Sequence, residues 1–200
     1  RLYRRPVRGG RADDVLVYEE ADNGFFMGVG VLESKAYIAI STGNQEQSEV
    51  RLIPAATPNA TPVVFHPRTP ALRYDVTHWD GKWFIRTNAD GATDFKVMTC
   101  LEGQTGKAFW RDDRPYDAGR FGEGLTAVKY WLVRLERVNA LQSIVLRNRL
   151  TGAEHTISQE EAAYSLSLDP GYEWDTGVVR YVYTSPTTPR QWIDYDLSAR

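Results

Sequence analysis

The chain has 200 residues, of which 42% are hydrophobic and 25% charged, and its formal charge at pH 7 is −2. This composition excludes a disordered chain, because enough apolar surface is available to offset the entropy lost on folding. The longest apolar stretches are far shorter than the roughly 20 residues that cross a bilayer, so we expect no membrane partner. The near-neutral charge also argues against a nucleic-acid partner.

Cys100 is the only cysteine in the sequence. An internal disulfide is therefore excluded, and nothing indicates an oxidising compartment. The basic segment 1–11 is not followed by the apolar stretch of a signal peptide. We therefore expect a cytoplasmic protein. The sequence starts at Arg1 rather than at a methionine, and we expect it to be a piece of a longer chain.

Short runs of alternating apolar and polar residues predict strands throughout the chain. The clearest pair, 74–79 and 82–87, is separated by Asp80-Gly81. This dipeptide favours a two-residue hairpin, because both central positions of a type I′ turn need positive φ. In chain order, strands are expected at 1–7, 15–20, 25–32, 36–41, 48–55, 62–66, 72–79, 82–88, 94–101, 107–110, 124–129, 130–138, 141–148, 154–158, 164–169, 178–185 and 190–197.

Two sets of strand centres repeat with nearly the same period. The first set is separated by 47, 48 and 48 residues and comprises Val50, Val97, Val145 and Ile193. The second set is separated by 47, 48 and 49 residues and comprises Ile38, Ile85, Val133 and Val182. A repeat of this length with four strands matches a β-propeller blade, which takes about 40–50 residues.

The predicted fold is therefore all-β: a partial β-propeller of about four to five four-stranded antiparallel blades. Residues 1–20 are expected to end one blade, and 164–200 to form an incomplete last blade. Full blades are expected at 25–66, 72–110 and 121–158. A β-sandwich with accidental spacing is the alternative. An open arc leaves strand edges bare, which predicts self-association.

Motifs for catalysis and cofactor binding are missing from the sequence, which contains no G-x-S-x-G and no P-loop. His66, His78 and His155 lie in or beside predicted strands, where a half-exposed surface histidine is more common than a catalytic base. Cys100 has no basic neighbour in sequence to lower its pKa. We predict no catalytic residue, no metal site and no cofactor in this chain.

Two other functions remain open at this stage. Propeller glycosidases gather carboxylates around a central channel, where a pair acts as acid and as nucleophile or base. The innermost predicted strands supply Asp75 and Glu123 for such a pair. The other alternative is a stand-alone propeller that serves as a protein-interaction module.

Several segments resemble the N-terminal propeller of the oligopeptidase B (protease II) branch of the prolyl oligopeptidase family of serine peptidases. The most specific are Phe-Ile-Arg-Thr-Asn-Ala-Asp-Gly at 84–91 and Arg-Tyr-Val-Tyr-Thr-Ser at 180–185, followed by Thr-Thr-Pro at 187–189. Weaker matches, in the same order as in the family, are found at 14–20, 48–52, 74–76 and 136–137.

The resemblance implies a seven-bladed propeller joined to a C-terminal α/β-hydrolase domain that carries the catalytic Ser, Asp and His. Such enzymes cleave short peptides, and this branch cleaves after Arg or Lys. The propeller is expected to act as a gate that excludes folded proteins. The hydrolase domain would follow Arg200, so the chain itself is expected to be inactive. Asp75 and Arg180 are the candidates for residues of the channel near the substrate.

Overall fold

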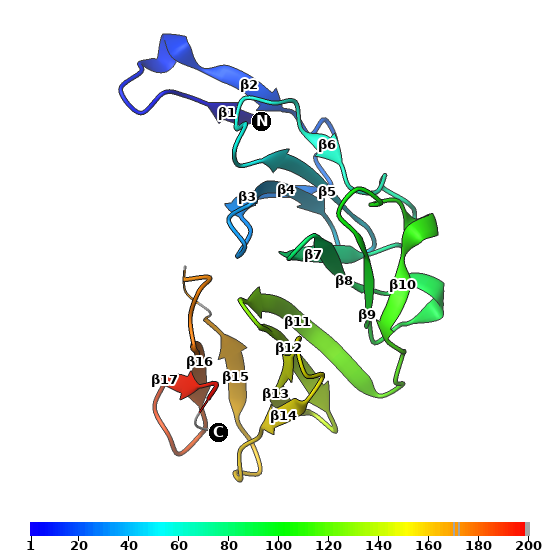
Figure 1. Ribbon diagram of the computed structural model, residues 1–200, viewed down its shortest axis with the longest axis vertical. Helices are drawn as coiled ribbons and strands as arrows, with labels where there is room; N and C mark the ends of the chain where they lie inside the picture. The colour runs from blue at the N-terminus through cyan, green and yellow to red at the C-terminus, as the bar shows by residue number, and fades with distance from the viewer. Residues whose placement is uncertain (170, 172, 199–200) are drawn as a thin grey trace.

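The computed structural model describes residues 1–169, 171 and 173–198. Its strands form five separate antiparallel sheets, which follow one another along an arc (Figure 1). A two-stranded sheet comes first, with β1 (Leu2–Arg4) and β2 (Val15–Tyr18). Three four-stranded sheets and one three-stranded sheet follow, and in each the spatial order of the strands is their order in the chain.

The first four-stranded sheet contains β3 (Phe26–Val31), β4 (Tyr37–Gly43), β5 (Ser48–Pro54) and β6 (Val63–Val64). The second contains β7 (Tyr74–Trp79), β8 (Lys82–Thr87), β9 (Lys96–Leu101) and β10 (Arg111–Arg114). The third contains β11 (Arg120–Val128), β12 (Trp131–Val138), β13 (Leu141–Asn148) and β14 (Glu154–Ile157). The three-stranded sheet contains β15 (Ser165–Leu168), β16 (Val178–Thr184) and β17 (Gln191–Asp196).

This arrangement confirms the predicted all-β propeller arc. In Figure 1, β3, β7 and β11 lie on the concave side of the arc, where the channel of a propeller would be, and β6 and β10 lie on the convex side. The repeat found in the sequence also has a structural meaning. The four positions of the first set, which starts at Val50, lie on the third strands β5, β9, β13 and β17. The four positions of the second set, which starts at Ile38, lie on the second strands β4, β8, β12 and β16.

The hairpin predicted at Asp80-Gly81 is present between β7 and β8. Asp80 has φ 44° and Gly81 has φ 72°, as a type I′ turn requires. The turn also sets the register of the two strands, in which Trp79 lies opposite Lys82.

The strand predicted at 107–110 is wrong. Lys107–Phe109 is a short 3-10 helix, and the last strand of this sheet is β10, so the sheet ends at Arg114 rather than at 110. The apolar side chain at the end of the predicted strand, Trp110, is buried, although it does not lie in a strand. The sequence Arg-Asp-Asp-Arg of β10 lacks such a pattern, because ion pairs rather than apolar contacts hold this outer strand.

The first strand of the third sheet begins earlier than predicted, at Arg120 instead of 124. Gly122 and Gly124 weaken the strand pattern in the sequence, since glycine has no side chain to pack. In the structure, the Gly122 amide donates a hydrogen bond to the carbonyl oxygen of Asp94, at 2.8 Å. This contact joins the start of β11 to the second sheet.

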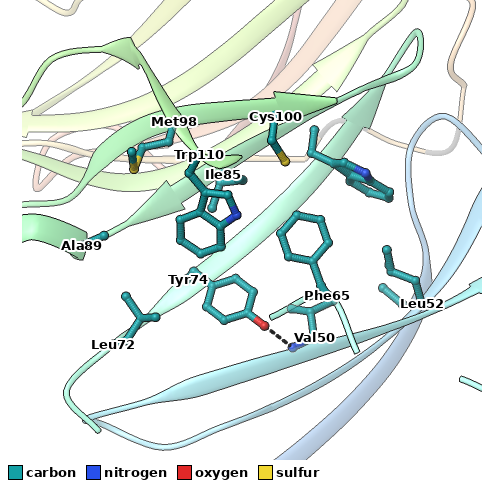
Figure 2. Close-up of a cluster of buried hydrophobic side chains, with 12 residues drawn as sticks. Val50, Leu52, Phe65, Leu72, Tyr74, Ile85, Ala89, Met98, Cys100 and Trp110 are labelled. Atoms are coloured by element: carbon teal, nitrogen blue, oxygen red, sulfur yellow. Dashed lines mark hydrogen bonds between the residues drawn. The ribbon is translucent and has the colours of Figure 1, made fainter. Parts of the chain in front are cut away.

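Two large apolar cores hold the arc together. The first lies between the first and second four-stranded sheets and contains Trp83 and, among the residues labelled in Figure 2, Phe65 and Trp110. Tyr74 crosses this core: its hydroxyl donates to the His66 carbonyl oxygen at 2.6 Å and accepts from the Val50 amide at 3.0 Å. Burial raises the pKa of Tyr74 to about 12.

The second core lies between the third four-stranded sheet and the three-stranded sheet. Its buried members are Val128, Val133, Leu135, Ile144, Leu146, Ile157, Leu166, Val179, Tyr181, Tyr183 and Leu197. Between the second and third four-stranded sheets the apolar contact is smaller, with Phe84 and Val97 packed against Ala127 and Leu132. The same interface also has a polar part, which is described below.

Candidate functional site

Asp75 lies on β7, the first strand of its sheet, where a propeller channel is lined. The hairpin register places it opposite Arg86, whose Nε and Nη2 donate to Oδ2 at 2.8 and 2.5 Å. Arg86 also donates from Nη1 to the carbonyl oxygen of Gly122 on β11, at 2.8 Å. Desolvation raises the pKa of the Asp75 carboxyl, and the neighbouring charges of Arg86 and Arg73 oppose this. The pair therefore connects two sheets.

The pair of Asp75 and Arg86 was not predicted, although it follows from the register of the predicted hairpin. In a hairpin centred on 80–81, residues whose numbers sum to 161 face each other, and 75 and 86 satisfy this condition. The opposite charges at these two positions could therefore have been recognised as a cross-strand ion pair.

Arg180 lies on β16, the second strand of the three-stranded sheet. Its Nε and Nη2 donate to the two carboxylate oxygens of Asp194 on β17, at 2.6 and 2.8 Å. The pairing raises the pKa of Arg180 and lowers that of Asp194. About half of each side chain is exposed. Arg180 and Asp75 thus lie on different sheets, and each binds a partner within its own sheet.

Glu123 on β11 is held by two neighbours. Its Oε1 accepts from Arg137 Nε at 2.5 Å, and its Oε2 accepts from Gln142 Nε2. Gln142 in turn accepts from the Leu166 amide at 2.7 Å, which joins the third sheet to the three-stranded one. The two carboxylates considered for glycoside hydrolysis, Asp75 and Glu123, are therefore each engaged with an arginine.

A cluster of ion pairs occupies the interface between the second and third four-stranded sheets, and we call it the polar seam. Its centre is the buried carboxylate of Glu136 on β12, which accepts hydrogen bonds from three guanidinium groups. Arg134 Nε donates at 2.7 Å, and Nη1 of Arg114 and Nη1 of Arg120 each donate at 3.1 Å. Arg114 belongs to β10, so this group of charges bridges the two sheets.

Further pairs extend the polar seam outward. Asp113 on β10 accepts from Arg147 at 3.0 Å and from Arg149 at 3.3 Å. Arg149 also lies over the ring of Phe84, with 4.2 Å from Cζ to the ring centroid. Lys96 on β9 pairs with Asp112 at 2.8 Å within the second sheet. The buried Arg134 was not predicted from the sequence, where it is a charge in the otherwise apolar run Trp-Leu-Val-Arg-Leu.

The expectation for the histidines is wrong for His78, which is buried rather than half-exposed. Its Nδ1 lies 2.9 Å from Ser34 Oγ, its ring packs on Trp83 with centroids 4.8 Å apart, and burial lowers its pKa. Burial also raises the pKa of the Cys100 thiol to about 11. Cys100 belongs to the first apolar core, and His78 lies at its edge against Trp83.

Within residues 1–169, 171 and 173–198, no three His, Cys, Asp or Glu side chains gather as ligands for an ion. In the same described part of the chain, no helix has the length and apolar character needed to cross a bilayer. The chemistry that these polar clusters offer is charge recognition and ion pairing.

The sheets, their meander order and their arrangement along an arc define a partial β-propeller. The whole chain, residues 1–200, matches the family model of the prolyl oligopeptidase N-terminal β-propeller domain, and it therefore belongs to that family. This membership confirms the resemblance to the prolyl oligopeptidase family found in the sequence.

Individual relatives agree with this assignment. Dipeptidyl aminopeptidase BI of Pseudoxanthomonas mexicana is 38% identical over 178 residues, which cover 89% of this chain and 24% of that protein. Protease 2 of Moraxella lacunata is 25% identical over 197 residues, which cover 98% of this chain and 28% of that protein. The structure of oligopeptidase B from Leishmania major has a TM-score of 0.87 at 22% identity and covers 98% of this chain and 29% of that chain. The chain thus spans about a quarter of the length of these relatives.

Proposed function

We propose that the chain is the gating propeller of an oligopeptidase B-like serine peptidase that cleaves short peptides after Arg or Lys. The observation that carries the proposal is the match of all 200 residues to the propeller family of prolyl oligopeptidases. The proposed partner is a C-terminal α/β-hydrolase domain that supplies Ser, Asp and His. The propeller covers that active site and admits peptides while it excludes folded proteins. The proposed location is the cytoplasm.

The test uses the complete protein that contains this chain. We expect it to release a chromophore from an N-blocked Arg or Lys peptide and to leave folded protein substrates intact. The chain of residues 1–200 alone should show no hydrolysis. Hydrolysis by the isolated chain after repeated purification, or indifference of the complete protein to basic residues, would contradict the proposal.

A second candidate follows from the relative named dipeptidyl aminopeptidase BI, at 38% identity. In this alternative the complete protein removes dipeptides from free N-termini. The two candidates differ in their response to a blocked terminus. Equal activity on free and N-blocked substrates of one sequence favours the oligopeptidase, whereas activity on the free form alone favours the dipeptidyl aminopeptidase.

Asp75 and Arg180 are the proposed substrate-facing residues of the channel. Asp75→Asn and Arg180→Gln in the complete protein should change KM for peptide substrates with little change in kcat, because binding and not chemistry is altered. Glu46→Gln, at an exposed turn, is the matched control. A fall in kcat at constant KM would assign these two residues a different role.

Self-association of the isolated chain is a further part of the proposal. Apolar side chains are exposed on β3, with Phe26 at 84% and Val31 at 62%, and on β17, with Trp192 at 59%. These surfaces lie at the two ends of the run of larger sheets, and exposed apolar patches of this kind favour association. Light scattering should give a mass that increases with concentration, and a constant monomer mass would refute this part of the proposal.

A further inference from the structure

A small cavity lies in the polar seam, with a volume of about 30 Å³. This is about twice the room that one water molecule needs, so only a very small ligand fits. The cavity wall is rich in positive charge. Five cationic side chains line it: Arg86, Lys96, Arg114, Arg120 and Arg134. Asp117 and Glu136 contribute negative charge to the same wall, while Arg86 and Lys96 are paired with Asp75 and Asp112 beside it.

Arg134 is the most deeply buried of these cations, with 3% of its side chain exposed. Its Nε donates to Glu136 at 2.7 Å and its Nη1 donates to Glu154 at 3.0 Å. Its Nη2 is also buried and has no hydrogen-bond partner among the described residues. A buried donor on a charged group costs free energy when it is unpaired, so this nitrogen needs an acceptor.

The charges around Arg134 favour an anion as that acceptor. Glu136 is a single buried carboxylate shared by three guanidinium groups, so its one negative charge cannot balance them. The other acids that pair with these arginines are Asp117 and Glu154, with 54% and 41% of their side chains exposed. Water screens exposed charges more strongly than buried ones, so Glu136 is the main counter-charge to Arg134 inside the seam, and it leaves Nη2 of Arg134 without an acceptor among the described residues.

We propose that this cavity binds a small monovalent anion, which is chloride in ordinary salt, against Nη2 of Arg134. Arg114 and Arg120 supply further positive charge on the sides of β10 and β11. The size of the cavity selects a monatomic anion over a phosphate or a carboxylate. The bound anion completes the interaction of the second and third sheets, and this role is independent of any peptidase activity.

Bromide is the structural probe, because it replaces chloride and scatters X-rays anomalously. Crystals of the protein soaked in sodium bromide should show an anomalous peak within hydrogen-bond reach of Arg134 Nη2. Density for a water molecule alone at this position, without an anomalous peak, would overturn the proposal.

Thermal unfolding gives a second, independent test in solution. At fixed ionic strength, stepwise replacement of sodium gluconate by sodium chloride should raise Tm by a few degrees, because the ligand binds the folded state alone. The increase in Tm should level off once the site is saturated with chloride. Fixed ionic strength keeps the general screening of charges constant. Equal Tm values in the two salts would overturn the proposal.

Variants locate the effect. Arg134→Met should abolish the difference between the two salts, and Arg5→Gln, at an exposed arginine outside the second and third sheets, should keep it. If Arg134→Met does not fold, Arg114→Gln serves in its place, since this partly exposed residue lines the same cavity. Arg114→Gln should raise the chloride concentration at the midpoint of the Tm increase at least tenfold. A chloride response that is unchanged in the seam variants would contradict the assigned site.

Discussion

The carboxylate of Glu33 accepts a hydrogen bond from the hydroxyl of Thr126, 93 residues further along the chain, at 2.9 Å. Its other oxygen accepts from the Thr77 hydroxyl at 3.0 Å. Glu33 lies in the turn between β3 and β4, and the two threonines lie on β7 and β11. The Glu33 side chain thus connects three successive sheets by hydrogen bonds at the concave side of the arc.

Glu33→Ala should lower the free energy of unfolding by about 2 kcal/mol, because two buried threonine hydroxyls lose a charged acceptor. Urea unfolding monitored by tryptophan fluorescence measures the change. Glu46→Ala, in the next turn of the same sheet, is the control and should stay within about 0.5 kcal/mol of the unchanged protein. Equal effects of the two substitutions would contradict the bridging role.

Phe65 fills the centre of the first apolar core. Its side chain is 2% exposed and its ring lies 5.2 Å from that of Trp83, centroid to centroid. Phe65→Ala should cost about 3–5 kcal/mol through lost burial and the cavity that remains. Phe26→Ala removes the same ring from a site that is 84% exposed and should cost little. Denaturant unfolding compares the two, and a small effect of Phe65→Ala would show that the core collapses around the change.

Glu20 predicts a pH dependence of stability. Arg68 Nη2 donates to its carboxylate at 2.5 Å and, as the main cause, holds the pKa of Glu20 at about 2 in the folded protein, against an ordinary value of 4.5. A carboxyl with a lowered folded pKa stabilises the fold above its unfolded pKa, and this contribution disappears as the pH falls through the folded pKa. The contribution should therefore be full at pH 7 and decline from about pH 4.5 to about pH 2.

Glu20→Gln tests this dependence. The stability difference between the unchanged protein and the variant should be about 1–3 kcal/mol at neutral pH and should shrink as the pH falls through that window. Glu46→Gln provides the comparison, with a difference that stays near zero at every pH. A Glu20 difference that does not vary with pH would disprove the linkage.

Cys100 should react slowly with thiol reagents. The thiolate is the reactive form, and burial raises the pKa of this thiol to about 11. At pH 8 we expect modification by a disulfide reagent to be at least tenfold slower in the folded protein than in denaturant. The absorbance of the released thiol follows the reaction, and equal rates in the two states would contradict the burial of Cys100.

The features predicted correctly from the sequence are those that depend on local pattern. The hairpin at Asp80-Gly81 needs only two residues with positive φ, and the strand repeat depends on alternation within each strand. Strand β10 was missed because its four charged residues carry no apolar pattern. The burial of Arg134 was missed for a different reason. Alternation indicates on which face of a strand a side chain lies, but only the neighbouring sheet determines whether that face is exposed to solvent or buried.

The polar seam also has a consequence for how the chain unfolds. The first apolar core joins the first two four-stranded sheets and the second joins the last two larger sheets, whereas a smaller apolar cluster and the ion pairs of the polar seam connect the halves. Each half can therefore open as its own cooperative unit. Amide hydrogen exchange should divide accordingly, with β4, β5 and β8 sharing one opening free energy and β12, β13 and β16 sharing another.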